Sequence, residues 1–573
     1  MQDPTAQFAV SVGFFVSNFR QMTFFSAKTI SCILIAQLLL IGSLFPQANS
    51  VDLLVVNAKI YTVDNTFSTA EAVAVSKGKI VAVGTSAALK KSFAAAKTVD
   101  AKGAYLYPGF IDAHSHFYYY GNGLNAVDLI GTESWKECIE RVKTFYKLNP
   151  DCKWITGRGW DQNDWKSKQY PDRKELDKLF PNMPVYLSRV DGHAAIVNGA
   201  ALKAARIDAA SKVSGGKIEL QDGQPSGILI DNAAELVQAV IPGPDEQSNE
   251  KALLSAQQNC FAVGLTTVSD CGLDFPIVET IEKLQAAAKL KMKMYVMLSD
   301  AEKNYDFFKK RGIIKTSSLN VRGFKFYGDG ALGSRGACLI KDYEDKPGWN
   351  GFMLKSPAYF DSMAIFMRQN DLQMCTHAIG DSANLCILNA YAKVLKGKND
   401  LRWRIEHAQV VDSSCIGMFG RFSIIPSVQP THATSDMYWA GNRLGSKRLQ
   451  FAYAYGQLLR ENGWLPLGTD FPVEDISPLR TFCAAVFRKD NKGYPKFGFQ
   501  MENALSREDA IRGMTIWAAQ AQFEEAEKGS IENGKAADFV LLNVDLMKDA
   551  AKKISTAKVL YTFVNGEIVY RKP

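Results

Sequence analysis

The chain has 573 residues, 47% of them hydrophobic and 22% charged, which is typical of a globular protein and excludes a disordered or fibrous one. That length allows one large catalytic domain together with a smaller domain. The net charge of +8 is small for such a length and no long run of Lys or Arg occurs, so the sequence does not favour a nucleic-acid-binding surface.

Residues 1–50 have the pattern of a secretory signal peptide. The basic residue Lys28 precedes an apolar run over 30–45, and small residues suited to cleavage follow that run. An uncleaved membrane anchor is the alternative, which we disfavour because the run is short for a bilayer span. Either Met1 or Met22 is the start of this segment. We therefore expect an exported protein, periplasmic or secreted, with no stable membrane insertion after cleavage.

The ten cysteines include no Cys-x-x-Cys pair, so they indicate neither a disulfide framework nor a thiolate zinc site. Nine of them follow the apolar run, and this odd number implies at least one free thiol. We expect most of them to be small buried hydrophobic residues.

Short β-like segments occur at both ends of the remaining chain, and the last of them contains the hairpin signal Asn565-Gly566. We predict that 51–104 and 529–573 together form one small β-sandwich domain. The catalytic domain, 105–528, would then be inserted between these two parts.

Apolar strand-like runs alternate with helical stretches across the middle of the chain, which is typical of an α/β domain with a parallel sheet. Eight such runs fit a closed (β/α)₈ TIM-like barrel. They end near His116, Asp270, Met297, Lys325, His377, His407, Gln429 and Asp470. The interval from His116 to Asp270 far exceeds the roughly 30 residues of a βαβ unit. We therefore predict an insertion over about 125–250, after the first barrel strand, which serves as a lid over the strand ends that carry the chemistry.

The chain has only six histidines, and four of them lie at the ends of predicted strands. His114 and His116 are one residue apart on a strand, so their side chains point in the same direction, with Asp112 behind them on that face. Zinc in proteins is commonly bound by imidazole and carboxylate groups. Because packing gives little reason for so scarce a residue to gather there, we interpret the series as part of a metal site.

Three further side chains at strand ends are candidates for the same site. His377 and His407 each end a predicted strand, and Asp470 lies at the mouth of the last one. Glu406 faces away from His407 and is expected to orient a neighbouring side chain. The structural alternatives are a hydrogen-bonded or helix-capping role for His377 and a helix N-cap for Asp470.

Six motifs in order along the chain narrow this interpretation. They are Pro108–His116, Arg189–His193, Lys325–Arg335, Thr376–Asp381, Ile405–Ala408 and Gly468–Asp470. Together they resemble the amidohydrolase superfamily, and more closely its amidohydrolase family 3, which includes N-substituted formamide deformylase-like proteins. The resemblance covers nearly all of 51–573.

The resemblance implies a zinc centre with one or two ions, other divalent metals being alternatives. His114 and His116 would bind one ion, His377 and His407 a second, and Asp470 would lie beside the nucleophilic water.

Lys325 falls where many members of the superfamily carry a carboxylated lysine that bridges two metals. Since an ammonium group cannot bind a cation, Lys325 would have to be a carbamate to do this. The alternative, an ordinary lysine paired with Asp329 at a one-metal site, stays open.

The resemblance also implies a mechanism in which metal-activated hydroxide attacks an amide-like carbonyl, while Asp470 passes a proton to the leaving nitrogen. His193 and Arg335 are candidates to bind the carbonyl or the developing oxyanion. Their structural alternatives are loop hydrogen bonding and a surface salt bridge. His432 either borders the substrate or has a structural role.

We therefore expect a metal-dependent amidohydrolase that cleaves a C–N bond of an N-acyl or N-formyl small molecule. The alternatives are a lactonase, carbamate hydrolase, phosphotriesterase or deaminase on the same barrel, or a non-catalytic binding or regulatory protein. A small-molecule substrate is the expected partner, nucleic acid is not expected, and a homodimer is left open.

Overall fold

The computed structural model describes residues 49–573 except 125 and 151. The predicted signal peptide therefore lies outside the described residues, apart from Asn49 and Ser50, which begin the first strand. In the described part of the chain, no helix combines the length and the hydropathy needed to cross a membrane.

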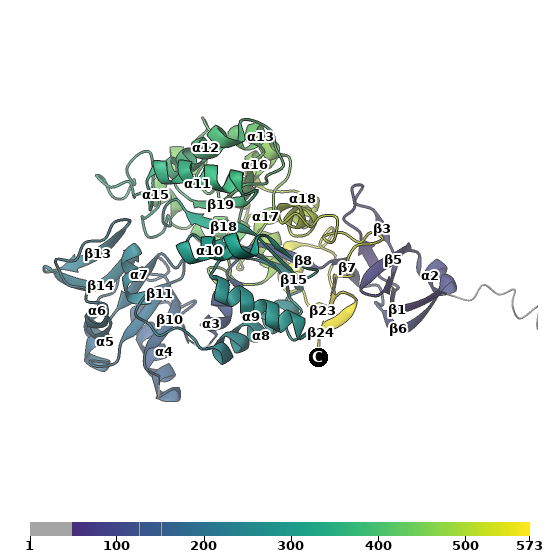
Figure 1. The fold of residues 1–573 in the computed structure, drawn as a ribbon, viewed down its shortest axis with the longest axis horizontal. Coiled ribbons are helices and arrows are strands. Elements are labelled where there is room, and N and C mark those ends of the chain that lie inside the picture. Colours follow the sequence, from purple (N-terminus) through teal and green to yellow (C-terminus); the bar gives the residue numbers. More distant parts are fainter. Residues whose placement is uncertain (1–48, 125, 151) are drawn as a thin grey trace, which may run out of the picture. The chain divides into compact units, whose positions relative to one another are not determined.

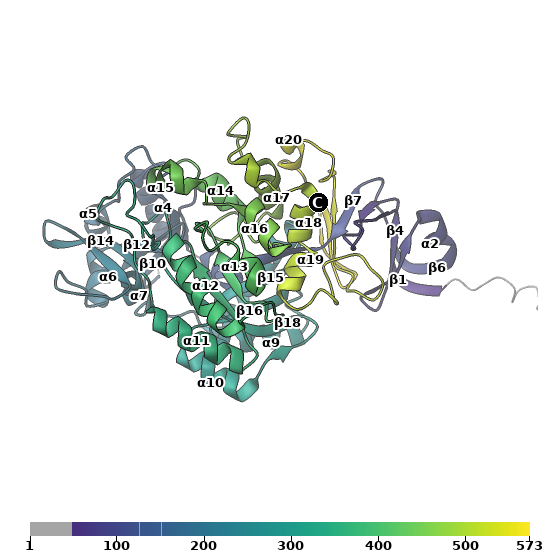
Figure 2. The ribbon, with the colours of Figure 1, turned by 90° about the horizontal axis from the view of Figure 1, so that it is seen from above.

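A parallel sheet with helices packed around it forms the centre of the fold (Figures 1 and 2), as the alternation of apolar runs and helical stretches predicts. Its strands end within a few residues of the predicted positions. In spatial order they are β8 (Phe110–Ser115), β15 (Leu265–Leu273), β16 (Lys293–Ser299), β18 (Leu319–Tyr327), β19 (Gln373–Ala378), β20 (Arg404–His407) and β21 (Ile425–Ser427). The short strand β17 (Ile314–Lys315) pairs with β18 outside this order.

The segment 466–470 takes the eighth place in the ring, although it is too short to form a regular strand. The Gly468 amide donates to the carbonyl oxygen of Val428 at 3.0 Å on the β21 side. On the β8 side, the Ala113 amide donates to Leu467 at 3.1 Å and the Asp470 amide donates to His114 at 2.8 Å. The nearly closed barrel predicted from the sequence is thereby confirmed, and Asp470 is attached directly to the strand end that carries His114.

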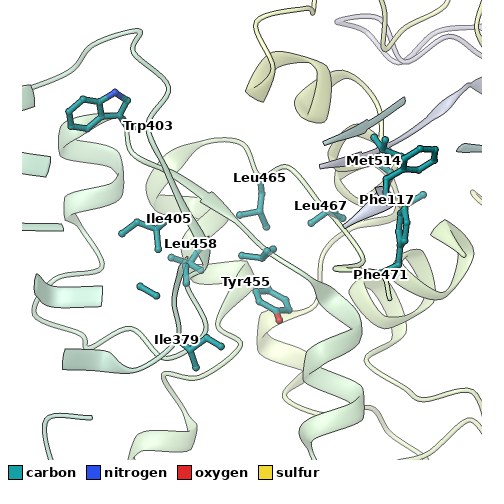
Figure 3. Close-up of a cluster of buried hydrophobic side chains, with 14 of the residues drawn as sticks. Phe117, Ile379, Trp403, Ile405, Tyr455, Leu458, Leu465, Leu467, Phe471 and Met514 are labelled. Carbon is teal, nitrogen blue, oxygen red and sulfur yellow. The ribbon is translucent and has the colours of Figure 1, made fainter. Parts of the chain in front are cut away.

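Close packing holds this closing segment in place. A Cβ atom on Gly468 would lie 2.5 Å from the His114 amide nitrogen, so only glycine allows the two backbones to approach this closely. Leu467 of the segment and its flanking residues Leu465 and Phe471 belong to one cluster of buried hydrophobic side chains that also includes Met514 (Figure 3). The segment is therefore a fixed part of the core and not a free loop.

Helices with one apolar face cover the outside of the barrel. In α12 (Asp381–Leu395), Ile387, Leu388, Tyr391 and Leu395 are buried at a spacing of three to four residues, which places them on the face that contacts the sheet. The other helices around the barrel are α3 (Phe117–Gly123), α8 (Glu246–Ala262), α9 (Phe275–Ala286), α10 (Glu302–Arg311), α11 (Pro357–Gln369), α13 (Met418–Phe422), α14 (Pro430–Asp436), α15 (Ala440–Leu449), α16 (Tyr455–Asn462), α17 (Pro478–Phe487), η1 (Met501–Asn503), α18 (Arg507–Gly513) and α19 (Ile516–Ala521).

The long interval between β8 and β15 contains a mixed sheet of its own. Its strand order is β13 (Gly216–Gln221), β14 (Gln224–Asp231), β12 (Ala194–Val197), β11 (Val185–Arg189), β10 (Ile155–Trp160) and β9 (Val127–Asp128). Four helices accompany it: α4 (Trp135–Leu148), α5 (Lys174–Leu179), α6 (Gly199–Ala204) and α7 (Asn232–Gln238). The last strand, β14, ends at Asp231.

Two further sheets involve the ends of the described chain. The first has the order β5 (Lys79–Gly84), β4 (Ala72–Ser76), β1 (Asn49–Val56) and β6 (Phe93–Asp100), with α2 (Ser86–Ser92) beside it. The second has the order β24 (Glu567–Arg571), β23 (Val559–Val564), β22 (Phe539–Leu542), β7 (Tyr105–Pro108), β2 (Lys59–Tyr61) and β3 (Thr69–Ala70), with α20 (Ala551–Ile554) between β22 and β23. Buried Leu53 and Val75 of the first sheet share one cluster with Leu106 and Phe563 of the second, so the two sheets have a common core.

Candidate metal centre

His114 and His116 at the end of β8 face the same carboxylate, as the two-residue period of a strand predicts. The Nε2 atoms of His114 and His116 lie 3.5 Å and 3.2 Å from Asp470 Oδ1. His114 is buried, whereas His116 is partly exposed. The hydrogen bonds that close the barrel therefore bring the first and last predicted strand ends into one site.

A buried ion pair holds the His114 imidazole in place. Glu406 Oε2 lies 2.5 Å from His114 Nδ1, and Glu406 Oε1 lies 2.6 Å from Arg404 Nε. Burial alone would raise the pKa of Glu406, but Arg404 and His114 lower it to about 2, so this carboxylate accepts the Nδ1 proton. Burial, together with the charge of Lys325, lowers the pKa of His114 to about 4. The ring is therefore neutral and its Nε2 lone pair faces Asp470.

Asp112 lies behind the two histidines on β8, but the described structure gives its carboxylate no hydrogen bond to either imidazole. Its carboxylate accepts hydrogen bonds from the backbone amides of His114 and Thr469 at 3.1 Å and 3.0 Å, and from the Thr469 hydroxyl at 2.7 Å. Asp112 therefore fixes the segment that carries Asp470, while Glu406 performs the orienting role that its direction on β20 had predicted.

Three more histidines lie next to this pair. The ring centroid of His407 is 4.8 Å from that of His114, 4.5 Å from that of His377 and 5.8 Å from that of His432. His432 Nε2 lies 3.6 Å from Asp470 Oδ2. The sequence leaves open whether His432 borders the substrate or has a structural role, because this residue lies on helix α14 and not at a strand end. Its place directly after the predicted strand end at Gln429 is the signal that could have assigned it to the site.

Lys325 lies inside the same cluster. Its Nζ atom is buried and 3.2 Å from His114 Nε2. The alternative pairing of Lys325 with Asp329 is not present: the Asp329 carboxylate accepts the backbone amides of Cys338, Ile379 and Gly380 at 2.8 Å, 3.0 Å and 2.8 Å. Asp329 thus ties together the loops after β18 and β19, and Lys325 is directed at the histidines.

The donor set fits a divalent metal ion. The triad His114, His116 and Asp470 and the triad His407, His432 and Asp470 each place three ligand atoms within 4.8 Å of one another. In the described structure, His377 Nε2, His432 Nε2 and Asp470 Oδ1 are buried without a hydrogen-bond partner. Burying such atoms unsatisfied costs about 1–3 kcal/mol each, which a bound cation would offset.

The protonation states also suit a cation. Burial and neighbouring positive charge lower the pKa values of His377 and His407 well below their usual range, which leaves both rings neutral. Burial would raise the pKa of Asp470, but the surrounding imidazoles hold it well below its usual range. Neutral imidazoles and an ionised carboxylate are the forms that bind zinc and related metals.

His193, predicted to bind the substrate carbonyl, lies at the edge of this cluster. Its Nδ1 is 2.7 Å from Asp231 Oδ1 at the end of β14, and its ring centroid is 5.0 Å from that of His377. Burial alone would lower the pKa of His193, but the hydrogen bond and charge of Asp231 raise it to about 9. At neutral pH this side chain is therefore an imidazolium that faces the centre.

The structure does not bring Arg335 to the histidines. Its Nε and a terminal nitrogen donate to the two carboxylate oxygens of Asp345 at 3.1 Å and 3.0 Å. Within the described residues, no hydrogen bond or ion pair joins it to the metal-ligand candidates. Its contacts are those of the salt-bridge alternative, and it lines a pocket beside the β13–β14 hairpin.

A cluster of histidines and a carboxylate at the carboxyl ends of barrel strands is the arrangement of a metal-dependent enzyme. Residues 97–570 match the profile of the amidohydrolase family. The chain therefore belongs to this family, specifically amidohydrolase family 3, as its motifs predict.

Comparisons with individual proteins agree with this assignment. The chain is 33% identical to protein LONG AFTER FAR-RED 3 of Arabidopsis thaliana, over 92% of this chain and 93% of that protein. It is 28% identical to N-substituted formamide deformylase of Arthrobacter pascens, over 91% and 98% of the two chains. Its fold is similar to the crystal structure of an uncharacterized metal-dependent hydrolase from Pyrococcus horikoshii, with a TM-score of 0.72, 26% identity, and coverage of 87% and 99%.

Proposed function

We propose that the protein hydrolyses the C–N bond of an N-acyl or N-formyl amide. The observation that carries this proposal is the position of Asp470, whose carboxylate lies 3.2–3.6 Å from the Nε2 atoms of His114, His116 and His432. The similarity to an N-substituted formamide deformylase supports the choice of an amide bond.

We propose zinc as the metal, held by His114, His116, His407, His432 and Asp470, with His377 beside them. When bound, such an ion supplies Lewis acidity and lowers the pKa of a coordinated water from 15.7 to about 7. One or two ions fit this set, and Lys325, if carboxylated, would add an oxygen ligand. As an ammonium group, Lys325 would instead place a positive charge beside His114.

Asp470 is the proposed proton carrier. Its carboxylate is ionised and buried, so it accepts a proton from the attacking water and returns that proton to the nitrogen of the leaving amine. Asp112 binds the preceding residue, Thr469, and the His114 carbonyl accepts the Asp470 amide hydrogen bond. This anchoring keeps the carboxylate in one position during both proton transfers.

His193 is the proposed donor to the carbonyl oxygen. As an imidazolium, held at Nδ1 by Asp231, it presents its Nε2 proton to the negative charge that develops on that oxygen. Because His193 lies beside His377, the oxygen that it stabilises would lie next to the metal-ligand cluster.

A substrate panel tests the proposed reaction. We expect N-substituted formamides and N-acyl amides with apolar substituents to be hydrolysed with a kcat/KM at least tenfold above that for lactones, carbamates and organophosphates of similar size. Formate or carboxylate release by the purified protein gives the rates, and the same panel with the Asp470→Asn variant excludes a contaminating hydrolase. Faster turnover of any other bond class would overturn the proposal.

A further inference from the structure

A pocket of about 460 Å³ lies beside the β13–β14 hairpin of the inserted sheet. Its walls come from the hairpin, from Tyr170 and from the loop after β18; they include Tyr170, Glu219, Ile228, Arg335, Asp345 and Lys346. A smaller recess next to it shares four of these residues and adds Lys217 and Trp349. We call the two together the hairpin pocket; Figure 1 shows the hairpin. Its volume is in the range of small-molecule sites.

Lys346 is the cation of the hairpin pocket that has no ion-pair partner among the described residues; the pocket is also lined by three carboxylates, of which Asp172 pairs with Lys174 at 3.3 Å. Lys217 Nζ is paired with Glu219 at 2.7 Å, and Arg335 is paired with Asp345, which also accepts a hydrogen bond from Arg443. No carboxylate of the described chain lies within ion-pair distance of Lys346 Nζ. Burial, together with the charge of Lys217, lowers the pKa of Lys346. An additional anion would relieve this repulsion.

Two uncharged groups of the hairpin pocket, the Tyr170 hydroxyl and the Trp349 ring, also fit an anionic ligand. The Tyr170 hydroxyl is buried and has no hydrogen-bond partner in the described structure. Trp349 provides an apolar wall: its ring centroid is 5.2 Å from Lys346 Nζ, and its Nε1 donates to the Arg335 carbonyl at 2.8 Å. An acceptor-only group such as a carboxylate would satisfy the hydroxyl and the ammonium group together.

The hairpin pocket shares a wall with the metal centre. Ile230 lines the recess, and the next residue, Asp231, binds His193. Cβ atoms on Gly330 and Gly336 would lie 2.7 Å and 2.6 Å from Asp231 Oδ2, so the loop that carries Arg335 packs directly on this carboxylate. One chain segment thus contributes to both sites.

We propose that the hairpin pocket binds a carboxylate group of the substrate, at the end remote from the bond that is cleaved. The natural substrate is then an amide that carries a negative charge, with Lys346 as the principal determinant of this preference. This inference rests on the proposed hydrolysis of amides and names the substrate class for it.

The test uses a series of ω-formamido carboxylates with one to five methylene groups, each paired with its uncharged primary amide. For at least one chain length, we expect the carboxylate to have a kcat/KM at least tenfold above that of its amide. Lys346→Met should reduce this ratio to near unity, and Tyr170→Phe should reduce it several-fold. Lys341→Met, an exposed lysine of the same loop outside the pocket, should leave the ratio unchanged.

Calorimetric titration of the metal-loaded protein with the same carboxylates separates this inference from the proposed function. Binding that Lys346→Met weakens at least tenfold, in a protein that hydrolyses neither formamides nor N-acyl amides, would support the pocket and refute the reaction. Equal kcat/KM for carboxylates and amides at every length, or binding that Lys346→Met does not change, would overturn the pocket assignment whether or not formamides are hydrolysed.

Discussion

Replacing Asp470 with Asn is expected to lower kcat by about 10²- to 10⁴-fold, the usual contribution of a positioned acid–base group. Asn keeps the size of the side chain but cannot accept the proton of the attacking water. In the wild type, the Asp470 carboxylate lies 3.5 Å from His114 Nε2 and 3.2 Å from His116 Nε2. Steady-state kinetics on the best formamide of the panel measures the effect.

The matched control is Asp475→Asn, a change of the same kind five residues further along the chain. Asp475 is exposed; it pairs with Arg480 at 3.3 Å and accepts the Ser477 amide at 2.9 Å, so loss of its charge should change kcat less than twofold. Circular dichroism of both variants checks that the barrel is intact. A kcat for Asp470→Asn close to that of the wild type would refute the proton-transfer role.

Replacing Glu406 with Gln is expected to weaken metal binding about 10- to 100-fold and to destabilise the fold by about 3–5 kcal/mol. The variant leaves the buried guanidinium of Arg404 without a counter-charge. It also removes the carboxylate that keeps the Nδ1 proton on His114 and the Nε2 lone pair facing the centre. Titration against a metal-buffering chelator gives the affinity, and thermal unfolding of the metal-free protein gives the stability.

Glu508→Gln is the control for this second variant. Glu508 pairs with Arg512 at 2.9 Å on the surface of α18, where such pairs contribute at most about 1 kcal/mol. Its unfolding midpoint and metal affinity should match those of the wild type. Unchanged metal affinity in Glu406→Gln would show that Glu406 does not orient a ligand, even if the fold were weakened.

The barrel was predictable from the sequence because its strands are apolar runs, most of which end in a polar or charged side chain. His114, His377 and His407 stand at such ends, and parallel strands bring their carboxyl ends to one face of the sheet. The two-residue period of β8 gave the common direction of His114 and His116. Glu406 faces away from His407 on β20, which predicted that it orients a neighbouring side chain. The sequence did not identify that neighbour as His114, which lies 292 residues away.

Other parts of the site depend on contacts that no local pattern contains. Asp112 binds Thr469, 357 residues further along the chain, because the short closing segment of the barrel packs against β8. His432 reaches Asp470 from the first turn of a helix, where a strand period gives no direction. Arg335 belongs to a motif of the family, yet its guanidinium pairs with Asp345, ten residues away in the same loop, and lines the hairpin pocket.

The most direct test of a metal centre at this strand edge is the metal content of the purified wild-type protein. Elemental analysis after incubation with Zn²⁺ and removal of excess metal should find one or two equivalents of zinc per chain, and His114→Ala should retain less than half of that amount. A wild-type protein that holds no transition metal under these conditions would contradict the assignment of His114, His116, His407, His432 and Asp470 as ligands.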